Sequence, residues 1–113
     1  MLIAFSVAPS GPGELPAGEE PGSVSIAVAK ALRVVRDSGL PHSTDAMFTT
    51  VEGDWDECMD VVRRACAAVG PYGSRVSLVL KADIRPGHTG ELTGKVERVG
   101  RLLDDLPPEA AGG

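Results

Sequence analysis

The sequence is poor in aromatic residues and has no excess of basic charge. Its 113 residues include one Trp, one Tyr and two Phe, and the formal net charge is -5. Proteins that bind single-stranded nucleic acid usually stack bases on aromatic side chains and attract the backbone with positive charge. Because the sequence offers neither feature, we expect no nucleic acid among its partners.

Cysteine is also scarce, with only Cys58 and Cys66 in the chain. Both fall in one predicted helix, eight residues apart, which separates their Cα atoms by about 12 Å along the helix axis. A disulfide requires less than about 7 Å, so an internal bridge is excluded if this helix forms. The pair also lacks the CxxC spacing of redox and metal sites. We interpret both as buried thiols of a protein that stays in a reducing cytoplasm.

No apolar run approaches the roughly 18 residues that a membrane-spanning helix needs. The apolar start, residues 1–5, has no basic region before it and is too short for a signal peptide. We therefore expect a cytoplasmic protein with no membrane segment.

Motifs that would indicate catalysis or a metal are lacking as well. The two histidines, His42 and His88, stand far apart and have no metal-ligand spacing around them. The sequence has no G-x-S-x-G nucleophile motif, and Gly11-Pro12-Gly13 is not a phosphate-binding loop because no Lys-Ser/Thr follows it. We expect no catalytic residue, no metal and no cofactor.

Three segments have helical periodicity. The first follows Ser23, a suitable N-cap, and ends at Gly39 and Pro41. The second opens with a capping-box pair, Asp54 and Glu57, and has an apolar stripe made of Trp55, Cys58, Met59, Val62, Ala65, Cys66 and Val69. The third covers about residues 90–106, and its pattern predicts that it buries Leu92, Val96, Val99, Leu103 and Leu106.

The remaining apolar segments predict strands at residues 2–8, 42–47, 49–53 and 75–85, the middle two forming either a hairpin or one bent run. The resulting order, β-α-β-β-α-β with an extra C-terminal helix, predicts an α+β fold of the ferredoxin-like sandwich type. We expect one domain over residues 1–106, with a mobile loop at 9–22 and a disordered tail at 107–113. Two helices cover only one face of such a sheet, so homo-oligomerisation is expected.

Two polar groups near strand ends are candidate binding residues. Thr49, Thr50 and Glu52 place hydroxyls and a carboxylate beside the second helix, and Lys81 and Asp83 share one face of the last strand. Such carboxylates and hydroxyls can receive an amine-bearing ligand through charge-assisted hydrogen bonds. Alternatively, Lys81, Asp83 and Arg85 form an ion network between subunits.

Several segments in the same order resemble the small thiamine-binding protein family, the YkoF-like proteins with a ferredoxin-like fold. They are residues 3–9, 23–31, 38–41, 47–57, 75–76, 81–85 and 94–99, which together cover nearly the whole chain outside the 10–22 loop and the tail. The chain departs from the family pattern in a longer first loop, in Phe48 and in Ala82.

The resemblance implies a non-enzymatic protein that binds thiamine or its hydroxymethylpyrimidine part and assembles into homodimers or homotetramers through the sheets. By motif match, the ligand-binding positions are Ser6, Ser23, Thr49, Glu52, Lys81 and Asp83. The alternative is a structural or regulatory oligomerisation module without a small-molecule ligand.

Overall fold

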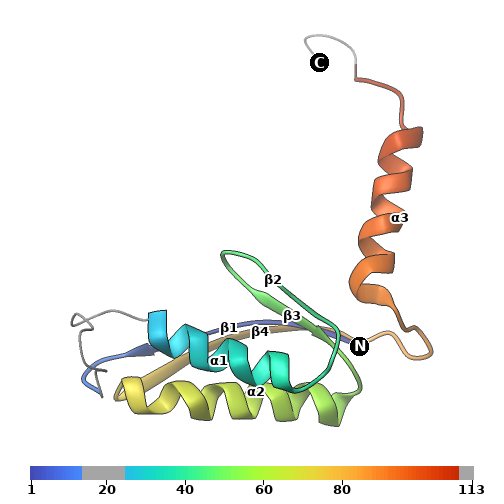
Figure 1. The fold of residues 1–113 in the computed structure, drawn as a ribbon. Coiled ribbons are helices and arrows are strands. Elements are labelled where there is room, and N and C mark those ends of the chain that lie inside the picture. Colours follow the sequence, from blue (N-terminus) through green and yellow to red (C-terminus); the bar gives the residue numbers. More distant parts are fainter. Residues whose placement is uncertain (14–24, 110–113) are drawn as a thin grey trace.

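The protein folds around one four-stranded antiparallel sheet with strand order β2-β3-β1-β4. A computed structural model describes residues 1–13 and 25–109 (Figure 1). The strands are β1 (Leu2–Ser10), β2 (His42–Thr44), β3 (Thr49–Glu52) and β4 (Arg75–Asp83), and the helices are α1 (Ser25–Asp37), α2 (Trp55–Val69) and α3 (Glu91–Asp105). A 3-10 turn, η1 (Gly70–Tyr72), leads from α2 into β4. This arrangement confirms the predicted ferredoxin-like α+β fold.

The core lies between the sheet and the layer formed by α1 and α2 (Figure 1). Ile3 and Phe5 of β1 are buried against this layer, and so is Val51 of β3, which is the strand partner of Ile3. Side chains alternate along a strand, so Leu2, Ala4, Ser6 and Ala8 point to the opposite face. We call that second side of the sheet the open face. On β4 it carries Ser77, Val79, Lys81 and Asp83, the partners of those β1 residues, as the strand pattern predicts.

The β2–β3 segment is a hairpin, which decides between the two predicted alternatives. Its strands are shorter than expected because residues 45–48 form the connecting turn. The expected end of the first strand at Pro9 is wrong, since β1 continues to Ser10 and Pro9 pairs with Val76. Proline is tolerated at this point because β3 reaches only to Phe5 and leaves this edge of β1 free. The loop expected at residues 9–22 therefore starts after Ser10, and its residues 14–22 lie outside the described residues. Residues 110–113 of the expected tail also lie outside them.

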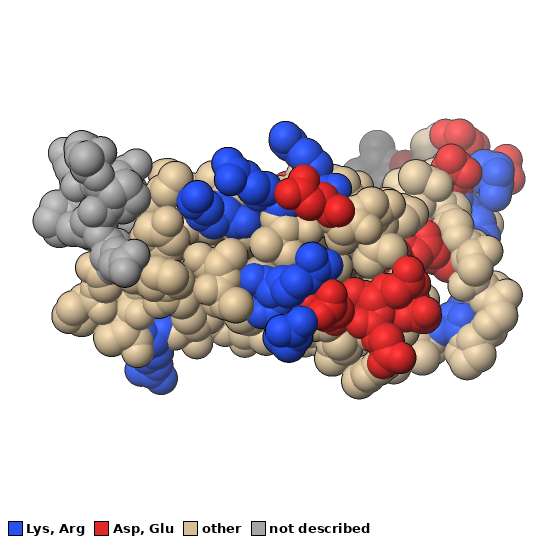
Figure 2. Space-filling view, turned by 60° about the horizontal axis from the view of Figure 1, so that its bottom comes forward, with Lys and Arg blue, Asp and Glu red and all other residues tan. Residues whose placement is uncertain are grey.

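The capping box at the start of α2 is present as predicted. The Asp54 carboxylate accepts a hydrogen bond from the Glu57 amide at 2.8 Å, and the Glu57 carboxylate accepts one from the Asp54 amide at 3.0 Å. Trp55 lies outside the core with 53% of its surface exposed, so its expected place in the apolar stripe is wrong. Figure 2 shows the acidic side chains gathered where α2 begins, the end of a helix whose dipole favours negative charge.

The third helix does not cover the sheet. It forms over Glu91–Asp105, close to the predicted range, but none of its residues is buried. In Figure 1 it rises away from the sheet at the end where the N-terminus lies. The expectation that this helix buries its apolar stripe is therefore wrong within the single chain, because nothing in the described residues packs beyond its first turns. We call α3 the arm.

Candidate functional site

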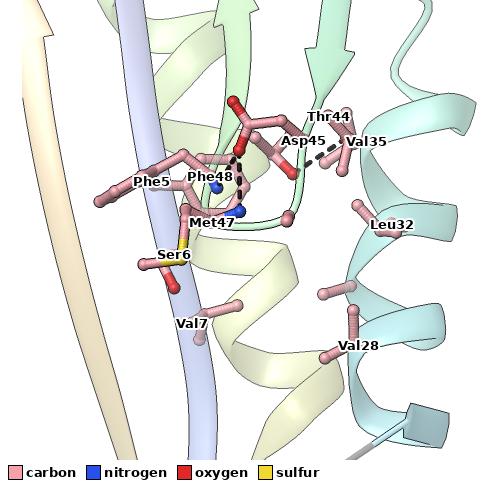
Figure 3. Close-up of a pocket in the computed structure, with 13 residues that line it drawn as sticks. Phe5, Ser6, Val7, Val28, Leu32, Val35, Thr44, Asp45, Met47 and Phe48 are labelled. Atoms are coloured by element: carbon pink, nitrogen blue, oxygen red, sulfur yellow. Dashed lines mark hydrogen bonds between the residues drawn. The ribbon is translucent and has the colours of Figure 1, made fainter.

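A pocket of about 140 Å³ lies between β1, α1 and the hairpin turn (Figure 3). Its apolar wall comes from Phe5 and Val7 of β1 and from α1 residues Val28, Ala31, Leu32 and Val35. The turn, residues 45–48, forms the other side. An apolar cavity of about 150 Å³ is large enough to hold benzene, so this pocket has the size of one six-membered ring.

Asp45 shapes the turn and supplies the charge of the pocket. Its Oδ1 accepts hydrogen bonds from the backbone amides of Met47 at 2.8 Å and Phe48 at 2.9 Å. These two bonds lower the pKa of the Asp45 carboxyl below its usual range. The side chain is exposed, and no Lys, Arg or His is found among the described residues that line the pocket. The pocket therefore presents an anionic acceptor.

Two hydroxyl groups also line the pocket. Thr44 and Thr49 are cross-strand partners, and their Oγ1 atoms lie 3.0 Å apart. Either hydroxyl can donate to the other, so the pair can offer one donor and one acceptor to a ligand. Thr49 is buried and Thr44 is exposed, which places the pair between the inside of the pocket and its mouth.

Two of the six predicted ligand-binding residues line this pocket. Thr49 contributes its hydroxyl, as described above. Ser6 belongs to the wall on β1, although strand alternation directs its side chain toward the open face. Phe48, which departs from the family pattern, also lines the pocket from the turn.

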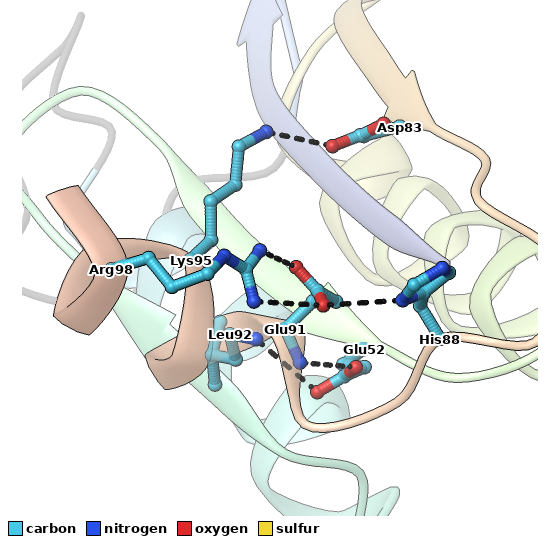
Figure 4. A network of polar contacts seen from close by, with 7 residues as sticks. All are labelled: Glu52, Asp83, His88, Glu91, Leu92, Lys95 and Arg98. Atoms are coloured by element: carbon cyan, nitrogen blue, oxygen red, sulfur yellow. Dashed lines mark hydrogen bonds and ion pairs between the residues drawn. The ribbon is translucent and has the colours of Figure 1, made fainter.

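Glu52 lies elsewhere, under the first turn of the arm (Figure 4). It is buried, and its two carboxylate oxygens accept hydrogen bonds from the backbone amides of Glu91 at 2.9 Å and Leu92 at 3.3 Å. A carboxylate in this position satisfies amides at the start of the helix and interacts favourably with the helix dipole. Within this chain, Glu52 holds the arm.

Asp83 also contacts the arm. Its carboxylate pairs with Lys95 of α3 at 2.7 Å, and within α3 the carboxylate of its first residue, Glu91, pairs with Arg98 at 2.6 Å (Figure 4). The hydrogen bond from Lys95 lowers the pKa of Asp83, and that from Arg98 lowers the pKa of Glu91. The Lys95–Asp83 pair is solvent-exposed and therefore a weak contact. The Glu91 side chain is only 12% exposed, and its pair with Arg98 lies within the helix. We call Glu52 with these two ion pairs the elbow contacts.

The remaining two predicted residues are separated from both groups. Lys81 is exposed on the open face of β4, opposite Ala4, and Ser23 lies outside the described residues. The five described positions therefore do not form one site within the chain: Ser6 and Thr49 line the pocket, Glu52 and Asp83 hold the arm, and Lys81 faces outward.

Sequence reasoning missed Asp45, the only charged residue among the described residues that line the pocket. The only signal was Asp45 itself, because Asp favours turns in which its own side chain accepts hydrogen bonds from the following backbone amides, whereas Ala46, Met47 and Phe48 are apolar. That signal predicts a turn; the neighbouring wall from α1 becomes evident only in the folded chain.

Other classes of site find little support in the described residues. They contain no group of three or more His, Cys, Asp or Glu side chains arranged to hold a metal ion. None of their helices is long and apolar enough to cross a membrane. Cys58 is buried and Cys66 partly buried, both are free thiols, and burial raises the pKa of each. A raised pKa makes a thiol a poor nucleophile at neutral pH.

The sequence matches the family model described as thiamine-binding protein over residues 4–100. The chain belongs to this family. Among its relatives, the UPF0045 protein Mb1933 of Mycobacterium bovis is 53% identical over 110 residues, which cover 96% of this chain and 98% of the relative. The UPF0045 protein sll0230 of Synechocystis is 31% identical over 84 residues, covering 74% and 69% of the two chains.

Solved structures of similar proteins have the same fold. The crystal structure of the hypothetical protein MJ1052 from Methanocaldococcus jannaschii has a TM-score of 0.73 and 32% identity, covering 89% of this chain and 96% of that one. The putative thiamine biosynthesis/salvage protein TM0486 from Thermotoga maritima has a TM-score of 0.66 and 24% identity, covering 87% and 96%. Membership in the thiamine-binding family makes small-molecule binding the function to consider for the hairpin pocket.

Proposed function

We propose that the chain binds a small, planar, amine-bearing compound of the thiamine type, with a pyrimidine-sized ring in the hairpin pocket. The protein acts without catalysis, as a homo-oligomer in the cytoplasm. The observation that supports this ligand class is the pocket itself, an apolar space of the size of one ring with one carboxylate and a pair of hydroxyls at its edge. Family membership supports the ligand class, and two free thiols suit a reducing compartment.

The chemistry of the edge favours a cationic or amine-bearing ring. Oδ1 of Asp45 is taken by two backbone amides, and among the described residues no hydrogen bond occupies Oδ2. Oδ2 can therefore accept from an exocyclic amine in a charge-assisted hydrogen bond, while the Thr44–Thr49 pair serves a ring nitrogen or hydroxyl. Phe5 and Val7 give the ring an apolar wall, as small-molecule sites require.

The volume of the pocket divides the ligand into two parts. About 140 Å³ accommodates one six-membered ring but not the two rings of thiamine. We therefore expect the pyrimidine part to provide most of the affinity, with the second ring outside the pocket near the exposed Met47.

Isothermal titration with thiamine and with hydroxymethylpyrimidine tests this function. Asp45→Asn keeps the acceptor that closes the turn but removes the charge, so we expect binding about tenfold weaker. Thr49→Val removes one hydroxyl with little change in shape and should weaken binding about fivefold. Asp37→Asn, an exposed carboxylate at the end of α1, is the matched control and should bind like the parent protein.

Two outcomes would overturn the proposal. Absence of heat with both compounds at millimolar concentration would remove the ligand class. Normal binding by Asp45→Asn and Thr49→Val would remove the pocket as the site, even if the ligand were correct.

A second candidate is a structural or regulatory oligomerisation module without a ligand. It is favoured by Glu52 and Asp83, because both carboxylates are engaged by the arm rather than directed at an empty site. This alternative predicts that Glu52→Ala and Asp83→Ala change subunit association in sedimentation experiments, while no ligand affinity is found for any variant.

A further inference from the structure

A second pocket continues from the hairpin pocket along α1 and has a volume of about 310 Å³. Its lining residues come from α1 and β2 and are Leu32, Val35, Arg36, His42, Ser43 and Thr44. Leu32, Val35 and Thr44 also line the hairpin pocket. In Figure 3, Thr44 and Val35 lie together where β2 faces α1. Because the two pockets share three residues, they form one groove between α1 and the hairpin. We call its second part the tail pocket.

The periodicity of the two elements directs polar side chains toward the tail pocket. Arg36 lies one helical turn after Leu32, so both residues are on the same side of α1. His42 and Thr44 are two residues apart on β2 and share one face of the sheet. This face is turned toward the helices, because Val51, the strand partner of His42, is buried in the core. Since β2 is the edge of the sheet, no further strand of the described residues closes the pocket from that side.

The tail pocket offers hydrogen-bond donors and positive charge. Arg36 is exposed, and within the described residues it takes part in no ion pair. Nδ1 of His42 lies 2.8 Å from the carbonyl oxygen of Leu40, which can only accept, so the hydrogen is assigned to Nδ1. Among the described residues no hydrogen bond occupies Nε2, which donates when the imidazole is protonated. A guanidinium, an imidazole and the hydroxyls of Ser43 and Thr44 are groups that bind a phosphate well.

The two parts of the groove have opposite charge. Asp45 is the charged residue of the hairpin pocket, whereas no Asp or Glu is found among the described residues that line the tail pocket. A ligand with an amine at one end and an anionic group at the other fits this polarity, and an uncharged alcohol uses only half of it. Arg36 repels the cationic second ring of thiamine, in keeping with the expected place of that ring near Met47.

From these observations we infer that the groove prefers a phosphate monoester of a one-ring, amine-bearing alcohol, such as the phosphate ester of hydroxymethylpyrimidine. The ring occupies the hairpin pocket with its amine at Asp45, and the phosphate lies in the tail pocket at Arg36 and His42. This inference rests on the proposed function and adds the phosphate group, which that function leaves open.

Isothermal titration of the full chain with hydroxymethylpyrimidine and with its phosphate ester tests this inference. We expect the ester to bind about tenfold more tightly, because charge-assisted hydrogen bonds to exposed side chains make a modest contribution. Arg36→Gln should weaken binding of the ester about fivefold, and Arg36→Gln/His42→Gln should reduce it to the affinity of the alcohol. Neither variant should change the affinity for the alcohol, which shows that the pocket remains folded.

Arg33→Gln is the matched control. It removes the same charge from the same helix, and Arg33 is exposed and lines neither part of the groove. Both affinities should stay at the parent values. Arg36→Lys keeps the charge but not the planar fork of donors, so it should retain part of the advantage of the ester. Inorganic phosphate alone should bind at least about tenfold more weakly than the ester, because it gains nothing from the apolar wall.

Three results would overturn the inference. One is equal binding of the alcohol and the ester by the parent protein, and another is an advantage of the ester that survives Arg36→Gln/His42→Gln. The third is inorganic phosphate that binds as tightly as the ester, which would mean that the ring and the phosphate do not share one groove. In all three cases binding of the alcohol still supports the proposed function. Absence of binding by both compounds would overturn that function and this inference together.

Discussion

Helices α2 and α3 are alike in sequence design and differ completely in burial. Each has 15 residues and an apolar stripe at helical spacing. Helix α2 buries five residues, namely Cys58, Val61, Val62, Ala65 and Val69, whereas α3 buries none. The comparison shows that an amphipathic pattern indicates a face that must be covered but not the molecule that covers it.

The connections explain the difference. Helix α2 joins β3 to β4, and β4 must return to pair with β1, so the connecting helix is carried across the sheet. The arm follows the last strand and has no such return. It turns away through residues 84–90, where Gly87 and Gly90 adopt left-handed conformations with φ of 80° and 69°.

One pair of substitutions measures this difference directly. Val61→Asp places a charge in the core of α2, where the parent side chain is 1% exposed, and should cost more than about 4 kcal/mol of unfolding free energy. Val96→Asp on the exposed stripe should leave the unfolding free energy of the monomer within about 0.5 kcal/mol of the parent value. Urea unfolding followed by circular dichroism gives both numbers.

Protein concentration separates the two variants further. A dimer raises the melting temperature as concentration increases, by mass action. We expect Val61→Asp to lower the melting temperature at every concentration, and Val96→Asp to leave the melting temperature of the monomer unchanged. Equal destabilisation by both substitutions would contradict the contrast between the helices.

Much of the fold could be predicted because its signals are local. The capping box at Asp54 and Glu57, the left-handed Gly39 after α1 and the alternation along β4 each involve neighbouring residues. The extent of β1 could not be predicted. Pro9 is tolerated because β3 pairs with β1 no further than Phe5, and β3 is 40 residues away in the sequence. The prediction that the arm is buried was wrong for a related reason, because the local pattern does not show which surface covers a helix.

The candidate site residues also differ in how far the sequence could predict their partners. Thr49 was predicted by motif match and as one of the hydroxyls near a strand end, and the structure places it in the pocket. Glu52 was predicted as a ligand acceptor from the same segment, yet its hydrogen-bond donors are amides 39 and 40 residues further along. A carboxylate at a strand end suits either partner, and only the tertiary structure distinguishes them.

A smaller effect is expected when the hold on the arm is loosened. Glu52→Gln keeps one acceptor oxygen but replaces the other by an amide NH2 group, which cannot accept a hydrogen bond from the second backbone amide of the arm. The first turn of α3 should open more readily by about 1 kcal/mol, which corresponds to about fivefold faster hydrogen exchange at Glu91 and Leu92. Exchange in β1 and α2 should be unchanged.

Glu97→Gln supplies the matched control for that experiment. Glu97 is exposed on the same helix, and no hydrogen bond or ion pair joins it to another described residue. Faster exchange in both variants, or in neither, would mean that Glu52 does not hold the arm.

The smallest expected effect is the pH dependence of the ion pairs at the base of the arm. The pKa values of Asp83 and Glu91 are lowered in the folded chain, so their ion pairs stabilise the elbow above the unfolded pKa near 4. That contribution is lost as pH falls through the lower folded values. Carboxyl chemical shifts followed by NMR should show Lys95→Met raising the pKa of Asp83 while that of Glu91, set mainly by Arg98, stays low. If both carboxyls shifted together, the elbow would act as one coupled network instead of two separate pairs, and the arm would be held more firmly than its exposed contacts suggest.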